Sequence, residues 1–165
     1  MKTNILSIDV SKRCTGYYIP HNNEFGTIRT NNDEHGDNFE LFQYIVKKIF
    51  ELYKQHNCEL IIMEDGFSFG KNKQETQKLV ELRACIKYEC IKQNIRIITY
   101  PPKVIKKTVC GKGNGTKNDV MEAIKNNEIY FDIIQKIGEF HTNGKNKNDD
   151  IIDAIAIYET YKNLN

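Results

Sequence analysis

Four carboxylates stand at places in the sequence where an acid needs compensation for its charge. Asp9 and Glu64 each end a short apolar run of strand-like sequence. Asp150 and Asp153 stand three residues apart at the start of an apolar helical segment, so they share one helical face. Because an isolated ionised carboxylate is not tolerated near a core, a metal ion is the natural partner for these side chains.

The expected ligands also indicate which metal would bind and what it would do. Ligation by oxygen alone, with no histidine or cysteine at ligand spacing, favours Mg²⁺ or Mn²⁺ over zinc. Two such ions a few ångströms apart stabilise the attacking water and the leaving oxygen in phosphodiester hydrolysis. Asp65 and Asp149 stand beside two of the expected ligands, and the sequence leaves open whether either also binds metal.

The stretch at residues 100–120 is rich in lysine and predicts a partner that carries phosphate. It has no acid before Asp119, and its three alternating glycines would let the backbone approach a phosphate closely. The formal net charge of the whole chain is only +2, so positive charge concentrated here favours contact with a polyanion. A solvated basic loop is the alternative interpretation. The lysines are Lys103, Lys106, Lys107, Lys112 and Lys117, and the glycines are Gly111, Gly113 and Gly115.

Two aromatic residues, Phe67 and Phe69, follow Glu64 in a segment that we expect to be a loop, residues 66–72. An exposed phenylalanine beside an acidic site could stack on a nucleic-acid base. Either side chain could equally fold back into the core, and the sequence does not decide between the two.

Hydrophobic patterning predicts one α/β domain that brings these residues together. Three β-prone runs with short connections predict an antiparallel meander at residues 4–10, 15–20 and 25–30. Two further strands, at residues 59–64 and 96–100, are joined by a helix, which makes them parallel. The expected helices span residues 37–55, 74–93, 103–109, 129–137 and 149–162, with a further helix from Lys117 that Thr116 would cap.

Length and composition fit a single globular domain over residues 1–165. A hydrophobic fraction of 39% is sufficient to build a core. The five cysteines are odd in number and dispersed, without a C-x-x-C pair, which indicates reduced thiols in a cytosol-like compartment. No apolar run reaches the length of a membrane span and no signal peptide is expected, so we expect a cytoplasmic protein without membrane contact.

The chain resembles one known family along its whole length, the RuvC-type Holliday junction resolvases of the RNase H-like superfamily. The segments that carry the resemblance are, in order, LSIDVSKRCTGYYI, IIMEDGF, YPPKVIKKTVCGKGNGTKNDV and DIIDAIAI. The third is the specific one, and it matches the family's pattern almost position for position, with Ile105 in place of a valine. The resemblance implies an RNase H-like fold, with a five-stranded mixed sheet whose first three strands are antiparallel and the rest parallel, flanked by helices.

The resemblance also implies an activity and a role for each matched residue. The implied activity is Mg²⁺-dependent, structure-selective endonuclease cleavage of Holliday junctions, by a homodimer that makes paired symmetric nicks during DNA recombination and repair. Mn²⁺ would substitute for Mg²⁺, with two ions in each site. Asp9, Glu64, Asp150 and Asp153 would be the catalytic acids, with Asp9 bridging the two ions. Lys106 and Lys117 would lie at the scissile phosphate, and Phe67 near the branch point of the junction. Departures from the family pattern indicate a divergent member of phage origin, which would act in the host cytoplasm.

Three alternatives use the same sequence features. A nuclease of the same fold with broader specificity for branched DNA, such as forks and flaps, would use the same four acids. An actin-like or sugar-kinase-like ATPase shares the first motif but needs two such domains, and 165 residues supply one. A junction-binding module without catalysis predicts the loss of one or more acids, and all four are present.

Overall fold

The chain folds around a five-stranded mixed sheet in a computed structural model that describes residues 3–66, 73–139 and 149–165. The strand order is β3-β2-β1-β4-β5. β1 pairs antiparallel with β2, and β2 with β3, while β1–β4 and β4–β5 are parallel, which confirms the expected topology. Every strand end lies within one residue of its predicted position. The strands are β1 Ile5–Asp9, β2 Cys14–Ile19, β3 Glu24–Arg29, β4 Leu60–Glu64 and β5 Arg96–Tyr100.

Helices account for most of the remaining described residues, and two of them begin with a capping box. Asp37 and Glu40 cap the start of α2, and Thr116 and Asp119 cap the start of α5, as expected for Thr116. The short α1 was not predicted, and the expected helix at 129–137 is a 3₁₀ turn, η1, followed by α6. The bounds are α1 Asn32–His35, α2 Asn38–Gln55, α3 Lys73–Lys92, α4 Pro102–Cys110, α5 Lys117–Lys125, η1 Glu128–Tyr130, α6 Phe131–Glu139 and α7 Asp149–Leu164.

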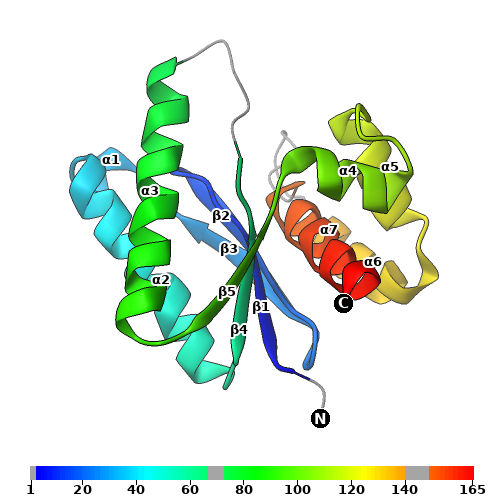
Figure 1. The fold of residues 1–165 in the computed structure, drawn as a ribbon, viewed down its shortest axis with the longest axis horizontal. Coiled ribbons are helices and arrows are strands. Elements are labelled where there is room, and N and C mark those ends of the chain that lie inside the picture. Colours follow the sequence, from blue (N-terminus) through cyan, green and yellow to red (C-terminus); the bar gives the residue numbers. More distant parts are fainter. Residues whose placement is uncertain (1–2, 67–72, 140–148) are drawn as a thin grey trace.

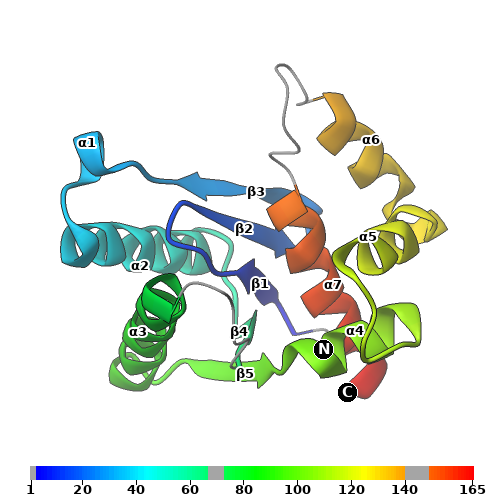
Figure 2. The ribbon, with the colours of Figure 1, turned by 90° about the horizontal axis from the view of Figure 1, so that it is seen from above.

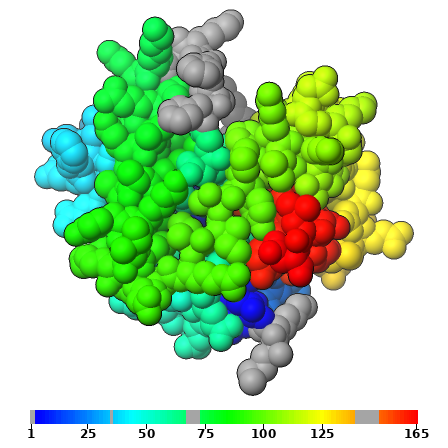
Figure 3. All heavy atoms as spheres, in the orientation of Figure 1, coloured from blue at the N-terminus to red at the C-terminus, as the bar shows by residue number. Residues whose placement is uncertain are grey.

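The helices form two layers, one on each face of the sheet. α2 and α3 pack on one face, whereas α4, α5, α6 and α7 lie on the other (Figures 1 and 2). In the space-filling view, α3 covers one side of the visible face, and α4 and α5 cover the other side (Figure 3). Each face of the sheet has its own cluster of buried apolar side chains, so the molecule has two hydrophobic cores that share one sheet.

Alternation along the strands decides which layer each acid faces. Ser7 lies on the α7 side of β1, where its hydroxyl donates a hydrogen bond of 2.6 Å to the Ala154 carbonyl. Because successive strand side chains point to opposite faces, Asp9 lies on that side too. Ile62 belongs to the same core as α7, so Glu64 also faces α7. Asp65, one position later, falls on the side of α2 and α3.

A buried tyrosine ties η1 to α7. The Tyr130 ring is 1% exposed and meets the Tyr18 ring edge to face, with ring centroids 6.2 Å apart. Its hydroxyl donates a hydrogen bond of 2.5 Å to Glu159 Oε2. This contact fixes the C-terminal part of α7, which holds the metal-binding candidates at its other end.

We expect Tyr130→Phe to lower the free energy of unfolding by about 1–2 kcal/mol, because it removes a buried hydrogen bond to a charged group. Urea denaturation monitored by circular dichroism would measure the change. Ile129→Val is the control, because it also removes a single heavy atom, and Ile129 is 69% exposed, so its substitution should change stability by less than about 0.5 kcal/mol. Equal stability of Tyr130→Phe and the unsubstituted protein would contradict the expectation.

Candidate active site

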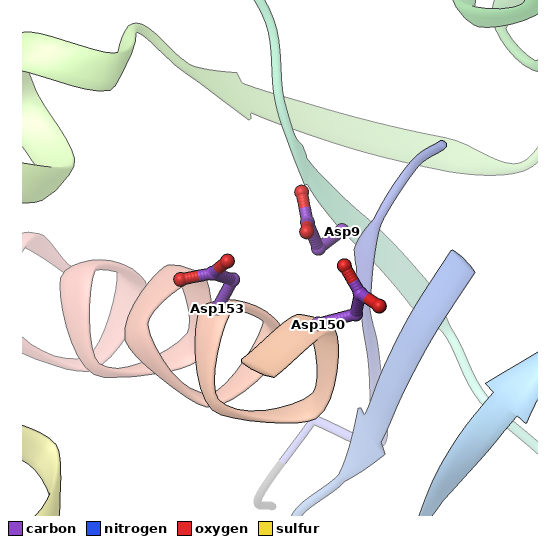
Figure 4. A group of neighbouring side chains, drawn as sticks. All are labelled: Asp9, Asp150 and Asp153. Carbon is purple, nitrogen blue, oxygen red and sulfur yellow. The ribbon is translucent and has the colours of Figure 1, made fainter. Parts of the chain in front are cut away.

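Three aspartates from the two ends of the chain meet beside the sheet. Asp9 ends β1, and Asp150 and Asp153 lie in the first turns of α7 (Figure 4). One carboxylate oxygen from each side chain lies within 4.8 Å of the other two. Three hard oxygen donors this close together suit a divalent cation such as Mg²⁺ or Mn²⁺. The expected grouping of Asp9 with the α7 acids is therefore present in the fold.

Gly16 explains how α7 comes so close to the sheet. It pairs with Asp9 in the β1–β2 ladder, and the backbone of Asp150 rests directly on it. A Cβ atom at this position would lie 2.0 Å from the Asp150 carbonyl oxygen and 2.8 Å from the Ile151 nitrogen. Only glycine leaves room for this contact, so β2 sets the distance between the aspartates of α7 and Asp9.

The electrostatics of the site indicate a deficit of positive charge. Burial raises the pKa of Asp9 well above its usual value, and the charges of Asp153, Glu64 and Asp150 raise it further. Burial also raises the pKa of Asp153, although Lys117 opposes that shift. A bound divalent cation would stabilise all of these carboxylates in their ionised form. The chemistry of the donors therefore fits a metal site.

Glu64 faces the same pocket but stands apart from the three aspartates. The pocket has a volume of about 240 Å³, and Asp9, Glu64, Asp153, Lys106 and Lys117 all line it. Among the described residues, the group of acids within 4.8 Å of one another does not include Glu64. Burial raises the pKa of Glu64, against the opposing effect of an arginine, Arg83. Glu64 therefore lines the same pocket as Asp9 without joining the group of three aspartates.

Both matched lysines lie beside the acids, and their place at a scissile phosphate stays a prediction. Lys106 comes from α4 and Lys117 from the first turn of α5, and both line the pocket of the acids. The Lys117 ammonium lies 3.0 Å from Asp153 Oδ2 and 3.9 Å from Asp149 Oδ2. Asp149 is thus at the margin of the site, within reach of Lys117.

The rest of the basic stretch lies outside the pocket. Lys103, Lys107 and Lys112 are exposed on α4 and the turn after it, where they can contact a polyanion. Gly111 is the left-handed cap of α4, with φ of 76°, and Gly115 packs where a Cβ would lie 2.7 Å from Cys110 Sγ. The structure thus explains why glycine occupies two of these three positions. Close approach of a phosphate to the turn stays a prediction.

Asp65, which the sequence left open as a metal ligand, pairs with a lysine away from the three aspartates. Phe67 and Phe69 lie outside the described residues. Asp65 forms an ion pair with Lys87 of α3, on the face of the sheet away from α7. Cys14 lies beside Asp150, and burial with the nearby Asp150 carboxylate raises the thiol pKa to about 12, so this thiol stays neutral.

Sequence reasoning missed Arg83, which contacts Glu64. The Arg83 Nη2 atom lies 3.2 Å from Glu64 Oε1, and the Arg83 side chain is only 5% exposed. The signal available in the sequence was a charge within the apolar stripe of α3, between Leu82 and Ile86, both fully buried. That pattern indicates a buried cation but does not identify its partner.

None of the described helices is long and apolar enough to cross a membrane.

Comparison with known proteins gives consistent matches over the whole fold. The protein-family description "Crossover junction endodeoxyribonuclease RuvC" matches residues 5–160. A protein of that name from Campylobacter concisus (strain 13826) is 29% identical over 163 residues, which cover 96% of each chain. Another, from Histophilus somni (strain 129Pt), is 32% identical over 127 residues, which cover 73% of this chain and 65% of the relative.

Solved structures share the fold at low sequence identity. The structure described as T. thermophilus RuvC in complex with Holliday junction substrate has a TM-score of 0.70 at 15% identity, covering 98% of this chain and 93% of that chain. The Fowlpox virus Holliday junction resolvase has a TM-score of 0.56 at 15% identity, covering 96% of this chain and 97% of that chain. The expected RNase H-like fold is confirmed.

Proposed function

Because the chain belongs to the family of RuvC crossover junction endodeoxyribonucleases, we propose that it resolves four-way DNA junctions by metal-dependent hydrolysis. The observation that carries this proposal is the meeting of Asp9, Asp150 and Asp153, two of which, Asp9 and Asp153, line one pocket with two lysines. Acids supply metal ligands there, and lysines supply charge for a phosphate. As a DNA-processing enzyme it would act in the cytoplasm, or in the host cytoplasm if phage-borne.

The acids and the lysines of the site would have separate roles in phosphodiester hydrolysis. Asp9, Asp150 and Asp153 would hold one Mg²⁺ ion, and Asp9 with Glu64 would hold a second. Bound metal supplies a nucleophilic water and stabilises the leaving oxygen. The chain itself orients the scissile phosphate through the ammonium groups of Lys106 and Lys117.

We expect Lys106→Gln to lower the cleavage rate about a hundredfold and to weaken junction binding. The lost phosphate contact should also reduce the slope of log Kd against log salt by about one. Gel-shift titrations at several salt concentrations, with single-turnover cleavage, would measure both effects. Lys125→Gln, at the exposed end of α5, is the matched control and should change neither. A Lys106 variant with an unchanged salt slope would remove this lysine from the proposed interface.

The proposed homodimer has a surface that could form its interface. α2 and α3 enclose an apolar groove of about 870 Å³ on the face of the sheet away from the acids. Phe39 is 78% exposed and Tyr88 is 66% exposed at this groove, which is unusual for large apolar residues. The other apolar lining residues are Phe42, Val46, Phe50 and Ala84. A second copy of the chain would bury this surface.

We expect Tyr88→Glu to convert the dimer into monomers, because a charge in the groove cannot be desolvated without a partner. Light scattering after size exclusion would report the mass, and a cruciform plasmid would show single nicks in place of paired ones. Ile129→Glu is the control, because Ile129 is 69% exposed in the opposite layer and should leave the mass unchanged. Dimers of Tyr88→Glu with full paired nicking would place the interface elsewhere.

The proposed function is tested by cleavage of an end-labelled four-way junction in Mg²⁺ and in Mn²⁺, beside duplex and three-way fork controls. Symmetric paired nicks confined to the four-way substrate would support a resolvase and a working dimer. Cutting of forks and junctions alike would instead support a broader branched-DNA endonuclease with the same active site. Tight binding to the junction with no cutting in either metal would leave only a binding module.

A further inference from the structure

Arg83 reaches from one helical layer to an acid that faces the other layer. It lies on α3, which packs on the face of the sheet away from α7, whereas Glu64 faces α7. The guanidinium spans the end of β4. Its Nη2 atom lies 3.2 Å from Glu64 Oε1, and its Nη1 atom lies 3.1 Å from the Gly66 carbonyl oxygen. One side chain thus holds both Glu64 and the backbone two residues beyond it.

The surroundings of Arg83 are unfavourable for a cation, which argues that its role is not general stability. Its neighbours Leu82 and Ile86 on α3 are fully buried, and Arg83 itself is 4% exposed. Its Nε is buried without a hydrogen-bond partner among the described residues. A buried ion pair of this kind adds little net stability compared with apolar side chains, but it fixes geometry. The geometry that this pair fixes is that of Glu64.

We propose that Arg83 is a positioning residue for the metal-binding carboxylate of Glu64, an inference that rests on the proposed function. The guanidinium binds Oε1 of Glu64, and the Glu64 side chain lines the same pocket as Asp9. Partners that orient a ligand in this way affect metal binding and rate nearly as much as ligands do. By holding the Gly66 carbonyl at the same time, Arg83 also fixes where the chain leaves β4.

The next turn of α3 pairs the neighbouring acid, Asp65, with a lysine instead of an arginine. Lys87, four residues after Arg83, pairs with Asp65, which follows Glu64 and faces the α3 side of the sheet. The backbone nitrogen of Asp65 donates to the Tyr100 carbonyl at 3.0 Å, which extends the β4–β5 pairing by one residue. α3 therefore contacts both successive acids: Lys87 neutralises Asp65, whereas Arg83 holds Glu64 for the metal.

A lysine could not replace Arg83 fully in this position. The guanidinium is planar and always charged, and its separate nitrogens meet Glu64 and the Gly66 carbonyl at once. An ammonium group is a single point of charge on a flexible stem, so it would hold Glu64 less rigidly. This difference separates a positioning role from simple neutralisation of a buried acid.

The experiment compares Arg83→Gln, Arg83→Lys and the control Lys92→Gln, whose lysine pairs with Glu89 at the far end of α3. Cleavage of a four-way junction would be measured at saturating Mg²⁺, and junction affinity with Ca²⁺ in its place. We expect Arg83→Gln to lower kcat about 10- to 100-fold with KM and affinity unchanged. Arg83→Lys should recover part of the loss, and Lys92→Gln should match the unsubstituted protein.

Two kinetic results would each overturn the proposal: kcat within twofold of normal in a folded Arg83→Gln, or equal kcat for Arg83→Lys and the unsubstituted protein. If Arg83→Gln does not fold, the lysine variant decides, because it keeps the charge and should still cut more slowly at an unchanged unfolding temperature. Mn²⁺ binding without DNA separates this proposal from the function. A protein that cuts no junction would refute the proposed function alone, whereas Arg83→Gln binding Mn²⁺ normally would refute the role of Arg83.

Discussion

Asp9→Asn is expected to abolish junction cleavage, by about a thousandfold or more, while leaving junction binding intact. Asp9 is the acid shared by both proposed ions, and losing a metal ligand removes several kcal/mol of transition-state stabilisation. Binding should survive, because affinity comes mainly from contacts between lysines and phosphates. Single-turnover cleavage with a gel-shift titration of the same junction would measure both quantities. Cleavage by Asp9→Asn at the normal rate would show that the site lies elsewhere.

The stability of the same variant tests whether it is folded, and the sign follows from the pKa of Asp9. Its usual value is 3.8, and the folded state raises it well above that. As pH rises above about 4, the unfolded chain releases this proton before the folded protein does, so the metal-free protein loses stability from this group until the raised pKa is passed. Asparagine has no such loss. We therefore expect Asp9→Asn to unfold at a temperature no lower than the unsubstituted protein at pH 7 in EDTA.

Metal should then distinguish the two proteins in the opposite direction. Mg²⁺ or Mn²⁺ binds the folded site and raises the unfolding temperature of the unsubstituted protein by mass action. Asp9→Asn should show a much smaller rise at the same metal concentration. Equal shifts in the two proteins would mean that the ions bind away from Asp9.

Gly16→Ala is expected to lower kcat about a hundredfold although Gly16 has no side chain to take part in catalysis. Its Cβ would lie 2.0 Å from the Asp150 carbonyl oxygen, whereas real Cβ contacts essentially never fall under 3.0 Å. The first turn of α7 would therefore retreat by about 1 Å, and a displacement of that size in a catalytic site can cost about a hundredfold in rate. Cleavage kinetics and thermal unfolding of the same preparation would measure the two effects.

The control for this substitution is another glycine. Gly138 lies on α6, and a Cβ there would meet nothing within 4 Å. Gly138→Ala should keep full activity and gain up to about 1 kcal/mol of stability, because alanine favours a helix. Crowding at Gly16 should also destabilise the protein by about 1–3 kcal/mol. A fully active Gly16→Ala would show that the contact between β2 and α7 does not set the spacing of the aspartates.

The sequence was informative where a local pattern decides the structure. Apolar and β-prone runs placed every strand to within one residue, and the three-residue spacing of Asp150 and Asp153 put both on one face of α7. Thr116 was expected to cap α5 and does so through the Asp119 backbone nitrogen. These features depend on neighbours within a few residues, so a single sequence contains them.

The sequence was less informative where a contact joins distant layers. Arg83 contacts Glu64 only because α3 folds back over the end of β4, and no spacing in the sequence predicts that contact. The separation of Glu64 from the three aspartates likewise depends on contacts between distant layers. Gly16 was predicted only as part of a motif. The reason that glycine is required there, the backbone of α7 lying on β2, is visible only in the three-dimensional structure.

The hydroxyl of Ser7 bonds a carbonyl 147 residues further along the chain, and this long span has a consequence for protein synthesis. A ribosome releases the chain from its N-terminus, so the segments that form the sheet emerge long before α7 does. During that interval Asp9 has neither of its neighbours from α7. The group of three aspartates therefore forms only after translation has delivered the last helix of the fold.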